Sequence, residues 1–318
     1  MGTKDCGTRE EAEIVTTTHA KQVTGTPRKV SSSGTQTELK TQPRLSLAGA
    51  IHSEWIKASS LRSIRWTAAV SIVVGIAMSV VMAFAIRDLV GQDSAAGYID
   101  YLLTVTGFPA TFLSLVFGVL GVFVFSNEYS SGMILSTLTA APRRGIVRAA
   151  KAVVLTAASA VIAVIVVAGG VAISVALMPD VWEVLGDTQA LTGLAGTLFF
   201  LVGISLLSFA LAGIIRSTAG AITAVVGILL MAPLILQIVS GLVDWTWVVT
   251  VQNYLPMNLG STLSFGLTES VPMRTEMEQA DTGYGSVPTY WQASVAFIAW
   301  IALPMIACVK AFFARDAQ

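Results

Sequence analysis

The chain has 318 residues, of which 54% are hydrophobic and only 12% are charged, and its formal net charge is zero. Soluble domains carry about a quarter charged residues, so this composition excludes an ordinary soluble domain and indicates an integral membrane protein. We expect the lipid bilayer as a partner and no nucleic acid. His19 and His52, the only histidines, have no Cys or His at ligand spacing, and Cys6 and Cys308 are not placed to form a structural disulfide.

Residues 1–45 are rich in Thr, Ser, Gly, Lys and Glu and nearly lack large apolar side chains. Such a segment cannot bury enough surface to order itself, so it is predicted to be a disordered cytoplasmic tail. No apolar stretch follows Met1, and a signal peptide is therefore not predicted.

Residues 46–65 have a different pattern, with apolar side chains at helical spacing. The four members of this stripe are Leu47, Ile51, Trp55 and Ala58. Glu54 and Lys57 face elsewhere, which predicts an interfacial amphipathic helix with Trp55 at headgroup depth. The alternative is an ordinary cytosolic segment that leads into the first span.

Six apolar runs of about 20 residues follow, each long enough to cross roughly 30 Å of hydrocarbon. They predict an all-α polytopic membrane protein whose residues 66–318 form one six-span domain. The predicted spans are about 66–86, 106–125, 152–178, 191–215, 219–243 and 291–312. Only Arg216, Ser217 and Thr218 separate the fourth span from the fifth, which predicts a tight antiparallel hairpin.

The positions of Lys and Arg predict the orientation of these spans. All of them except Arg87 and Arg274 fall on one side of the predicted membrane, which is the side of both termini. Basic loops stay in the cytoplasm, so we expect a multi-pass plasma-membrane protein with both termini cytoplasmic.

The loop between the second and third spans, residues 126–151, is much longer than a simple connection requires. Tyr129 and Met133 lie four residues apart, as do Ile134 and Leu138, which predicts a short amphipathic helix. This patterned cytoplasmic loop is interpreted as a docking element for a cytosolic protein.

The second half of the same loop is basic. Pro142 suits the first turn of a second helix, because its missing N–H costs little there. Arg144, Arg148 and Lys151 then fall on one helical face that leads into the third span. The alternative reading of these residues and of Arg143 is that they only anchor the topology by reaching lipid headgroups.

The stretch 244–290, between the fifth and sixth spans, is the one large predicted outer feature. Its first half, through Leu267, is moderately apolar, which predicts short re-entrant or interfacial helices packed against protein. Its second half, Glu269–Pro288, is acidic and is predicted to be a solvated loop.

The predicted spans contain almost no ionisable side chains, with only Lys310 near the inner end of the last one. Proton-coupled carriers place titrating groups at membrane depth, so this weighs against a carrier and against a membrane-embedded hydrolase. The chain has no Gly-Lys-Ser/Thr sequence for a phosphate-binding loop. We therefore expect a transport subunit that is not an enzyme and whose energy enters through a cytoplasmic partner.

Three stretches carry a more specific pattern. They are NEYSSGMI at 127–134 with LTAAPRR at 138–144 and Lys151, SEWIK at 53–57 with SLRS at 60–63, and YLPMNLG at 254–260. In this order they resemble the cytoplasmic loop, the N-terminal interfacial helix and the outer re-entrant segment of ABC-2 type transporter permeases, notably actinobacterial ones. The resemblance runs in the right order from about Leu47 to Phe313.

The resemblance implies a six-helix permease half that forms a homodimer or a pair with a second permease and binds separate cytosolic ATPase subunits. ATP and Mg would be bound by the partner subunit and no cofactor by this chain. The implied ATPase-coupling loop contains Glu128, Tyr129, Gly132, Met133, Pro142, Arg143 and Arg144. The implied interfacial helix, with Glu54, Trp55 and Lys57, lies beside the contact between the coupling loop and the ATPase. The implied outer re-entrant segment contains Tyr254, Pro256 and Asn258. Candidate path-lining residues on the second and fifth spans are Phe108, Leu115, Leu230 and Gln237.

Simpler roles exist for several of these residues. Glu128 is also suited to an interfacial helix end, Gly132 to a turn, and Gln237 to a structural hydrogen bond between helices. The function expected is ATP-driven export of an amphipathic small molecule, such as a drug, an antibiotic or a lipid-like compound. The alternative is a non-transporting membrane scaffold or regulator that recruits a cytosolic partner through the loop 126–151.

Overall fold

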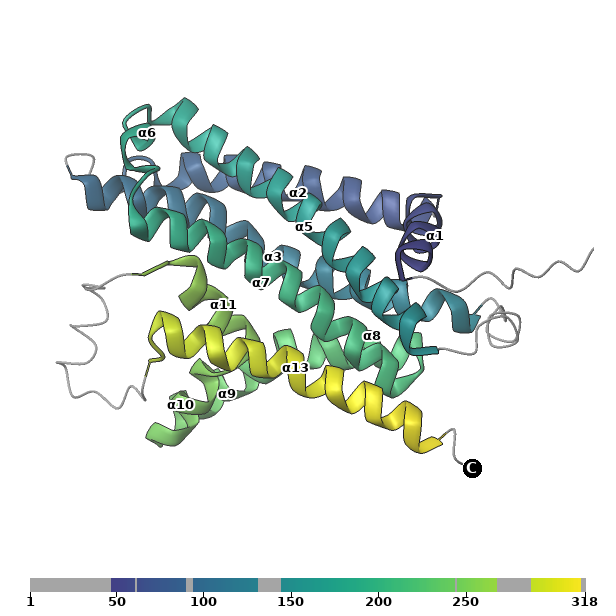
Figure 1. Ribbon diagram of the computed structural model, residues 1–318. Coiled ribbons are helices and arrows are strands. Elements are labelled where there is room, and N and C mark those ends of the chain that lie inside the picture. The colour runs from purple at the N-terminus through teal and green to yellow at the C-terminus, as the bar shows by residue number, and fades with distance from the viewer. Residues whose placement is uncertain are drawn as a thin grey trace, which may run out of the picture. The chain divides into compact units, whose positions relative to one another are not determined.

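The structure is a computed structural model, and it describes residues 47–60, 62–89, 94–130, 144–243, 245–267 and 287–315. The predicted disordered tail, residues 1–45, lies outside the described residues. Six described helices are long and apolar enough to cross a membrane, which confirms the prediction of a helical, multi-pass membrane protein. Figure 1 labels these helices along the chain.

Four of the six spans lie within uninterrupted helices from the first part of the chain: α2 (Arg62–Ile86), α3 (Ala95–Ser130), α5 (Arg144–Leu177) and α7 (Thr188–Ile215). The fifth span consists of α8 (Thr218–Val226), the π-helix η1 (Gly227–Met231) and α9 (Ala232–Leu242), and the sixth lies within α13 (Tyr290–Arg315). Several helices extend beyond the predicted spans, so Asp100, Arg148 and Lys151 also lie near helix ends. The predicted cores between them remain almost free of charge.

Helices α3 and α7 pack along each other and form the centre of the bundle (Figure 1). Helices α2 and α5 pack against this pair and against each other, and α13 packs against α7. Helix α7 is buried around much of its circumference, because helices α3, α5, α8 and α13 all contact it.

The fourth and fifth spans are joined by a very short turn, as the sequence predicts. Arg216 ends α7 in the left-handed conformation, with φ of 56°. Ser217 then begins α8, because its side chain accepts a hydrogen bond of 3.3 Å from the backbone N–H of Gly220. This cap reverses the chain within three residues.

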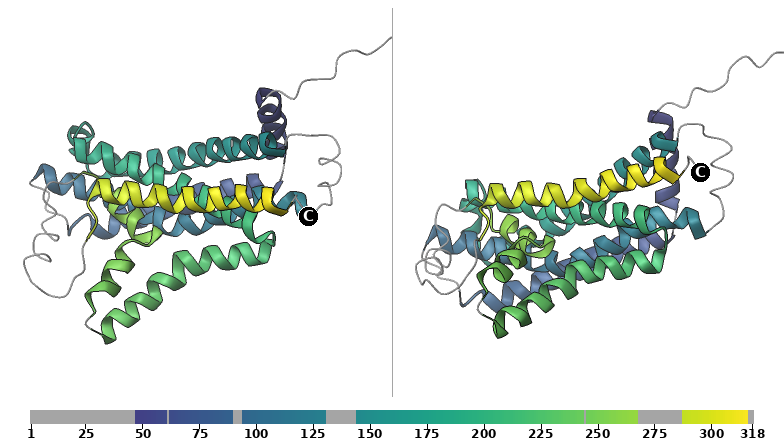
Figure 2. Two further views of the ribbon diagram at one scale, coloured as in Figure 1. Left: turned by 60° about the horizontal axis from the view of Figure 1, so that its bottom comes forward. Right: turned by 90° about the horizontal axis from the view of Figure 1, so that it is seen from below.

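The fifth span is irregular where η1 interrupts it. Pro233, the second residue of α9, has no N–H to donate to the preceding turn, so a regular α-helical ladder cannot continue through this point. From there α9 diverges from the other spans toward its end at Leu242 (Figure 2, left). None of the α9 residues is buried.

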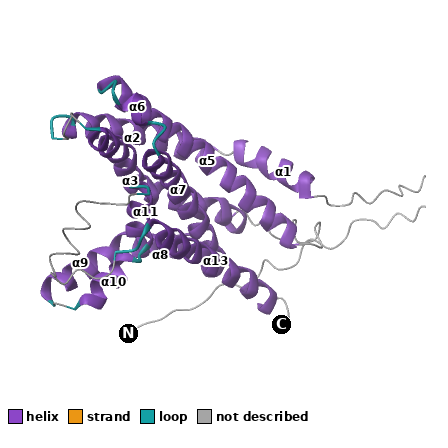
Figure 3. Ribbon diagram, turned by 60° about the vertical axis from the view of Figure 1, so that its left-hand side comes forward, coloured by secondary structure: helices purple, strands orange, loops and turns teal. Residues whose placement is uncertain are grey.

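The remaining described elements are short helices: α1 (Leu47–Ser60), α6 (Val181–Val184), α10 (Thr246–Asn253) and α11 (Pro256–Ser264). Figure 3 shows only helices and connecting loops in the part of the chain that is described. Helix α6 lies in the connection from α5 to α7, near the start of α3, where Tyr98 Oη donates a hydrogen bond of 3.1 Å to Asp180 Oδ2.

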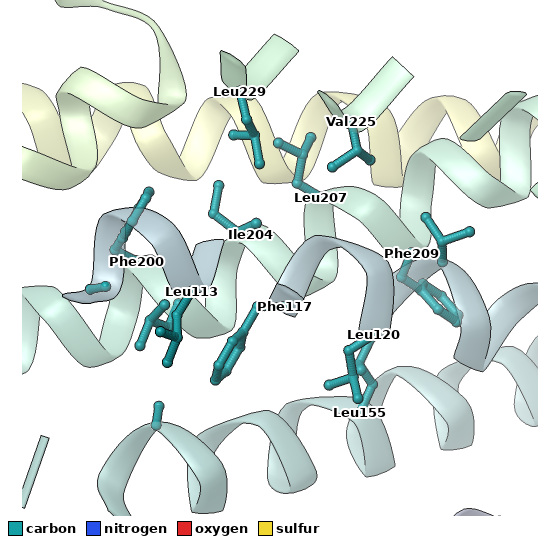
Figure 4. Packing of buried hydrophobic residues seen from close by; sticks show 14 of the residues in the cluster. Leu113, Phe117, Leu120, Leu155, Phe200, Ile204, Leu207, Phe209, Val225 and Leu229 are labelled. Carbon is teal, nitrogen blue, oxygen red and sulfur yellow. The ribbon is translucent and has the colours of Figure 1, made fainter. Parts of the chain in front are cut away.

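The central pair is held by close packing of apolar and small residues. Leu113 and Phe117 of α3 lie against a cluster that includes Phe200 and Ile204 of α7 (Figure 4). A Cβ at Gly121 would overlap the backbone oxygen of Ser205, so only glycine permits the observed approach of the two helices. In lipid, the hydrophobic effect does not drive helices together, because the lipid tails are as apolar as the side chains. Van der Waals attraction from such close contact stabilises the helix pair instead.

Several buried serine and threonine hydroxyl groups in the spans are satisfied within their own helices, although Ser79 Oγ of α2 is buried without a partner in the described residues. Thr106, Ser159 and Ser208 each donate a hydrogen bond of 2.8 Å to the carbonyl oxygen four residues earlier. This back-bonding lets polar side chains lie inside the bundle without a partner on another helix.

Candidate functional site

The first candidate region is the contact between α1 and the beginning of α5, at the end of the bundle where α3 ends and α5 begins (Figure 1). Helix α1 packs chiefly against α5 and buries Ala50 and Glu54. Trp55 and Ile56 remain exposed, at 45% and 53% of their surfaces. The face turned toward the protein is therefore the one that carries the acid, not the one that carries the tryptophan.

Glu54 is the centre of an ion-pair cluster at this contact. Its Oε2 lies 2.9 Å from Lys151 Nζ of α5, and its Oε1 accepts a hydrogen bond of 2.9 Å from Lys57 Nζ, one turn away on α1. The Glu54 and Lys151 side chains are 8% and 9% exposed, whereas that of Lys57 is 50% exposed. The buried pair thus joins two helices, and the exposed pair stays within one.

The charge state of Glu54 follows from these contacts. Burial by itself would raise the pKa of the carboxyl group, because it disfavours the charged form. The hydrogen bonds from Lys57 and Lys151, together with their positive charges, outweigh burial and hold the pKa below its ordinary value of 4.5. Glu54 is therefore ionised at neutral pH.

The predicted coupling loop is only partly within the described residues. The backbone of Glu128 and Tyr129 lies in the last turn of α3, and Arg144 is the first residue of α5. The remaining calls lie outside the described residues: Gly132, Met133, Pro142 and Arg143, and with them the predicted amphipathic helix. Helix α5 runs without a break from Arg144 through Lys151 into the third span, as predicted for the second half of the loop.

The second candidate region is the pair of short helices α10 and α11 between the fifth and sixth spans. Gln252 Nε2 of α10 donates a hydrogen bond of 2.7 Å to Gln237 Oε1 of α9. Asn258 Nδ2 of α11 donates a hydrogen bond of 2.7 Å to the carbonyl oxygen of Gln252. Trp300 Nε1 of α13 donates one of 2.9 Å to the carbonyl oxygen of Tyr254. The last two bonds are accepted by backbone carbonyl groups at and just after the end of α10, where the helical hydrogen-bond pattern stops.

Helix α11 is fitted closely against α7. A Cβ at Gly196 would overlap the carbonyl oxygen of Leu263, and one at Gly260 would overlap the ring of Phe200. As the numbering rises along α7, these contacts move backward along α11, so the two helices are antiparallel. Pro256, the first residue of α11, is buried.

The end of α11 is fastened to the beginning of α7. The backbone N–H of Leu267 donates a hydrogen bond of 2.8 Å to Thr192 Oγ1. Gly266 has φ of +75°, and a Cβ there would overlap the carbonyl oxygen of Gln189, so this turn requires glycine twice over. The two short helices thus contact α9, α7 and α13 through these hydrogen bonds. Residues 268–286, which lead on toward α13, are not described.

The four candidate path-lining residues differ in their surroundings. Phe108 is 41% exposed on α3, Leu230 is 37% exposed in η1, and Gln237 is exposed on α9. Leu115 instead packs against the central core. Gln237 is joined to the second candidate region, since it accepts the hydrogen bond from Gln252 of α10.

Three participants were not identified from the sequence: Lys151 as the partner of Glu54, Gln252 as the partner of Gln237, and Trp300. No local signal marks the first, because Glu54 and Lys151 lie far apart in sequence and meet only where α1 crosses α5. Trp300 gives no such signal in an apolar run. In the described residues no group of three His, Cys, Asp or Glu side chains is placed to hold a metal ion.

Comparison of the chain with protein-family models and with curated protein sequences finds no match.

Proposed function

We propose that this chain is the permease subunit of an ABC-2 type exporter in the plasma membrane, with both termini in the cytoplasm. A separate cytosolic ATPase subunit supplies the energy, and the cargo is an amphipathic small molecule such as a drug, an antibiotic or a lipid-like compound. The observation that carries the proposal is the buried Glu54–Lys151 ion pair, which ties α1 to α5, the helix that begins within the loop 126–151. A force on that loop would reach both α1 and the third span.

The amphipathic character of α1 supports its assignment as an interfacial helix. Glu54 faces α5, while Trp55 and Ile56 are exposed on the remaining surface. A tryptophan exposed beside a transmembrane span is suited to headgroup depth, where its ring is apolar and its N–H meets water. The helix would lie on the inner membrane surface beside the docking loop.

The geometry of α10 and α11 supports their assignment as an outer re-entrant segment. With eight and nine residues they are about 12 and 14 Å long, too short to cross roughly 30 Å of hydrocarbon. The contact of Gly260 with Phe200 lies about 18 Å along α7 from Thr188, and α11 also contacts η1 in the middle of the fifth span. Irregular backbone at such depth must pack against protein, as α11 does.

The exposed fifth span supports a paired arrangement of permeases. Helix α9 has no buried residue. Apart from η1, which precedes it in the same span, α10 is the described element that chiefly contacts it. A second permease copy, or a related one, would cover this surface and enclose a path with α3.

Reconstitution with an ATPase tests the proposal. The purified chain should hydrolyse no ATP alone, and co-expression with an ATPase encoded beside it should give a complex that moves ethidium or a fluorescent phosphatidylcholine across proteoliposome membranes. The Glu128→Ala variant should keep ATP hydrolysis in the complex and lose most transport, whereas Glu183→Ala, on the exposed outer helix α6, should change neither. ATP hydrolysis by the chain alone would overturn the proposal. A complex without any ATP-dependent flux would favour the scaffold alternative instead.

A further inference from the structure

The exposed face of the fifth span carries an ordered stripe of side chains. Moving inward from Gln237, Leu234 lies one turn away and Leu230 about two turns away, and both are exposed, at 49% and 37%. A Cβ at Gly241, one turn outward, or at Gly227, beyond Leu230, would meet nothing within 4 Å. The stripe is therefore partly exposed from Leu230 to Gln237, where Gln252 of α10 contacts its outer end.

The polar end of the stripe has unused hydrogen-bonding capacity. The bond from Gln252 Nε2 to Gln237 Oε1 leaves Gln237 Nε2 as a donor and Gln252 Oε1 as an acceptor, and neither makes another hydrogen bond within the described residues. A donor and an acceptor side by side match a hydroxyl group, which accepts from the first and donates to the second.

The position of this amide pair favours binding of a polar ligand in the membrane. Gln237 lies five residues before the end of α9, which is about 8 Å along the helix. Trp245 and Trp247, stacked with ring centroids 5.8 Å apart and both exposed, mark the outer interface beyond it. Each amide keeps one polar group beyond their mutual hydrogen bond, and leaving such a group unsatisfied in hydrocarbon is costly.

The surroundings select an uncharged ligand head. From Ser217 to Leu267 the only charged residue in the sequence is Asp244, so no cation of this segment is present to hold a phosphate or carboxylate. We infer that Gln237 and Gln252 form a headgroup site for an amphiphile with a neutral, hydroxyl-bearing head, whose tail lies along Leu234 and Leu230. As a cargo site it rests on the proposed export function, and it names the substrate class of that exporter.

Photolabelling of the full chain in phosphatidylcholine nanodiscs tests this site without any ATPase. Two probes carry the same diazirine-bearing alkyl tail, one with a maltoside head and one with a phosphate head. The maltoside should label residues 227–242 saturably, and the phosphate should label them at least several-fold less. The isosteric Gln237→Met, Gln252→Met double variant loses two neutral hydrogen bonds and should weaken maltoside labelling about tenfold.

The matched control is the Thr223→Val variant in α8. Thr223 is exposed, and its hydroxyl already donates a hydrogen bond of 3.0 Å to the carbonyl oxygen of Ala219. It should leave labelling unchanged, and thermal melting should confirm that all variants fold. Equal labelling by both heads, or no effect of the double variant, would overturn the inference. A further test uses the Gln237→Cys variant in a chain that also carries Cys6→Ser. If two copies of this variant form a disulfide and no maltoside labelling is seen, the inference is overturned, because the amides would then pair across a dimer.

The outcome separates the site from the transport proposal. Head-selective labelling in a chain that never associates with an ATPase supports the site and removes the exporter. ATP-driven flux with labelling that ignores the head and the variants keeps the exporter and overturns the substrate class.

Discussion

The central helices α3 and α7 and the fifth span are apolar to a similar degree, yet they are buried very differently. In the most apolar 18-residue stretch of each span, 56% of the residues of α3 and 61% of those of α7 are buried. In the fifth span the corresponding fraction is 11%. The glycines differ in the same way. A Cβ at Gly121 or Gly196 would overlap backbone of a neighbouring helix, whereas one at Gly227 or Gly241 would meet nothing.

This difference shows that apolarity does not decide which span occupies the centre of the bundle. In lipid, an apolar side chain gains little by leaving hydrocarbon for protein, so helices are held where small residues let backbones approach. The fifth span packs on α3 and α7 through α8, but α9 has no buried residue and no such close approach to the central helices. The exposed surface of α9 is open to contacts outside this chain, either with the proposed cargo or with a second copy of the chain.

Substituting Gly196 should have the largest effect on stability. The Gly196→Val variant places branched atoms where the backbone of Leu263 lies, and neither helix can yield without losing its other contacts. We expect the free energy of unfolding in mixed detergent micelles to fall by more than about 3 kcal/mol.

The control for this prediction is Gly241→Val in α9, which meets open space. Its unfolding free energy should stay within about 0.5 kcal/mol of the parent value. Equal losses for the two variants would show that the tight and the open glycines are not different after all.

The contrast also marks how far the sequence alone leads. The six spans follow from apolar runs and the tight turn at Arg216–Thr218 from the length of the connection, because both are local properties of the chain. Burial of α7 could not be predicted, since its run is apolar on all sides and carries no amphipathic signal. The polar Gln237 and Ser240 of α9 do not indicate whether that helix faces its own chain or its surroundings. Packing of Gly196 on Leu263 depends on two segments that are far apart in sequence.

The candidate sites show the same limit. The sequence indicated that Glu54 and Lys57 lie away from the apolar stripe of α1, and their ion pair spans one turn. It did not indicate that Glu54 is shared with Lys151, because that contact depends on how α1 crosses α5. Gln237 stood out as the most polar residue of its span, but its partner Gln252 lies on a separate short helix.

Replacing Lys151 should have an intermediate effect and tests whether α1 belongs to the tightly held part of the molecule. The Lys151→Met variant leaves the buried carboxylate of Glu54 with Lys57 as its remaining basic partner in the cluster. Breaking a buried pair is costly, and retention of Lys57 moderates the loss, so we expect about 2 kcal/mol of stability to be lost. The Lys57→Met variant removes a half-exposed partner and should cost less than about 1 kcal/mol.

The pH dependence of the same variants gives a second measurement. Because the folded-state pKa of Glu54 lies below 4.5, its contribution to stability is present above that pH and is lost as pH falls through the lowered pKa. The parent should therefore lose stability more steeply than Lys151→Met between neutral pH and the acid side of 4.5. Parallel pH profiles would contradict the assignment of this ion pair as a stabilising contact.

The smallest effect on the monomer is expected in the fifth span. Ile235 of α9 is 57% exposed, so Ile235→Ala removes few contacts and should change the unfolding free energy of the dilute chain by less than about 0.5 kcal/mol. The matched variant Ile204→Ala in α7, where the side chain is fully buried, should cost about 3 kcal/mol. If a second permease covers the fifth span, Ile235→Ala should still weaken association of copies in liposomes, measured by energy transfer, because its contacts exist only in the pair. A large loss of monomer stability from Ile235→Ala would mean that α9 packs against its own chain, and the open surface on which the proposed pairing and cargo site depend would not exist.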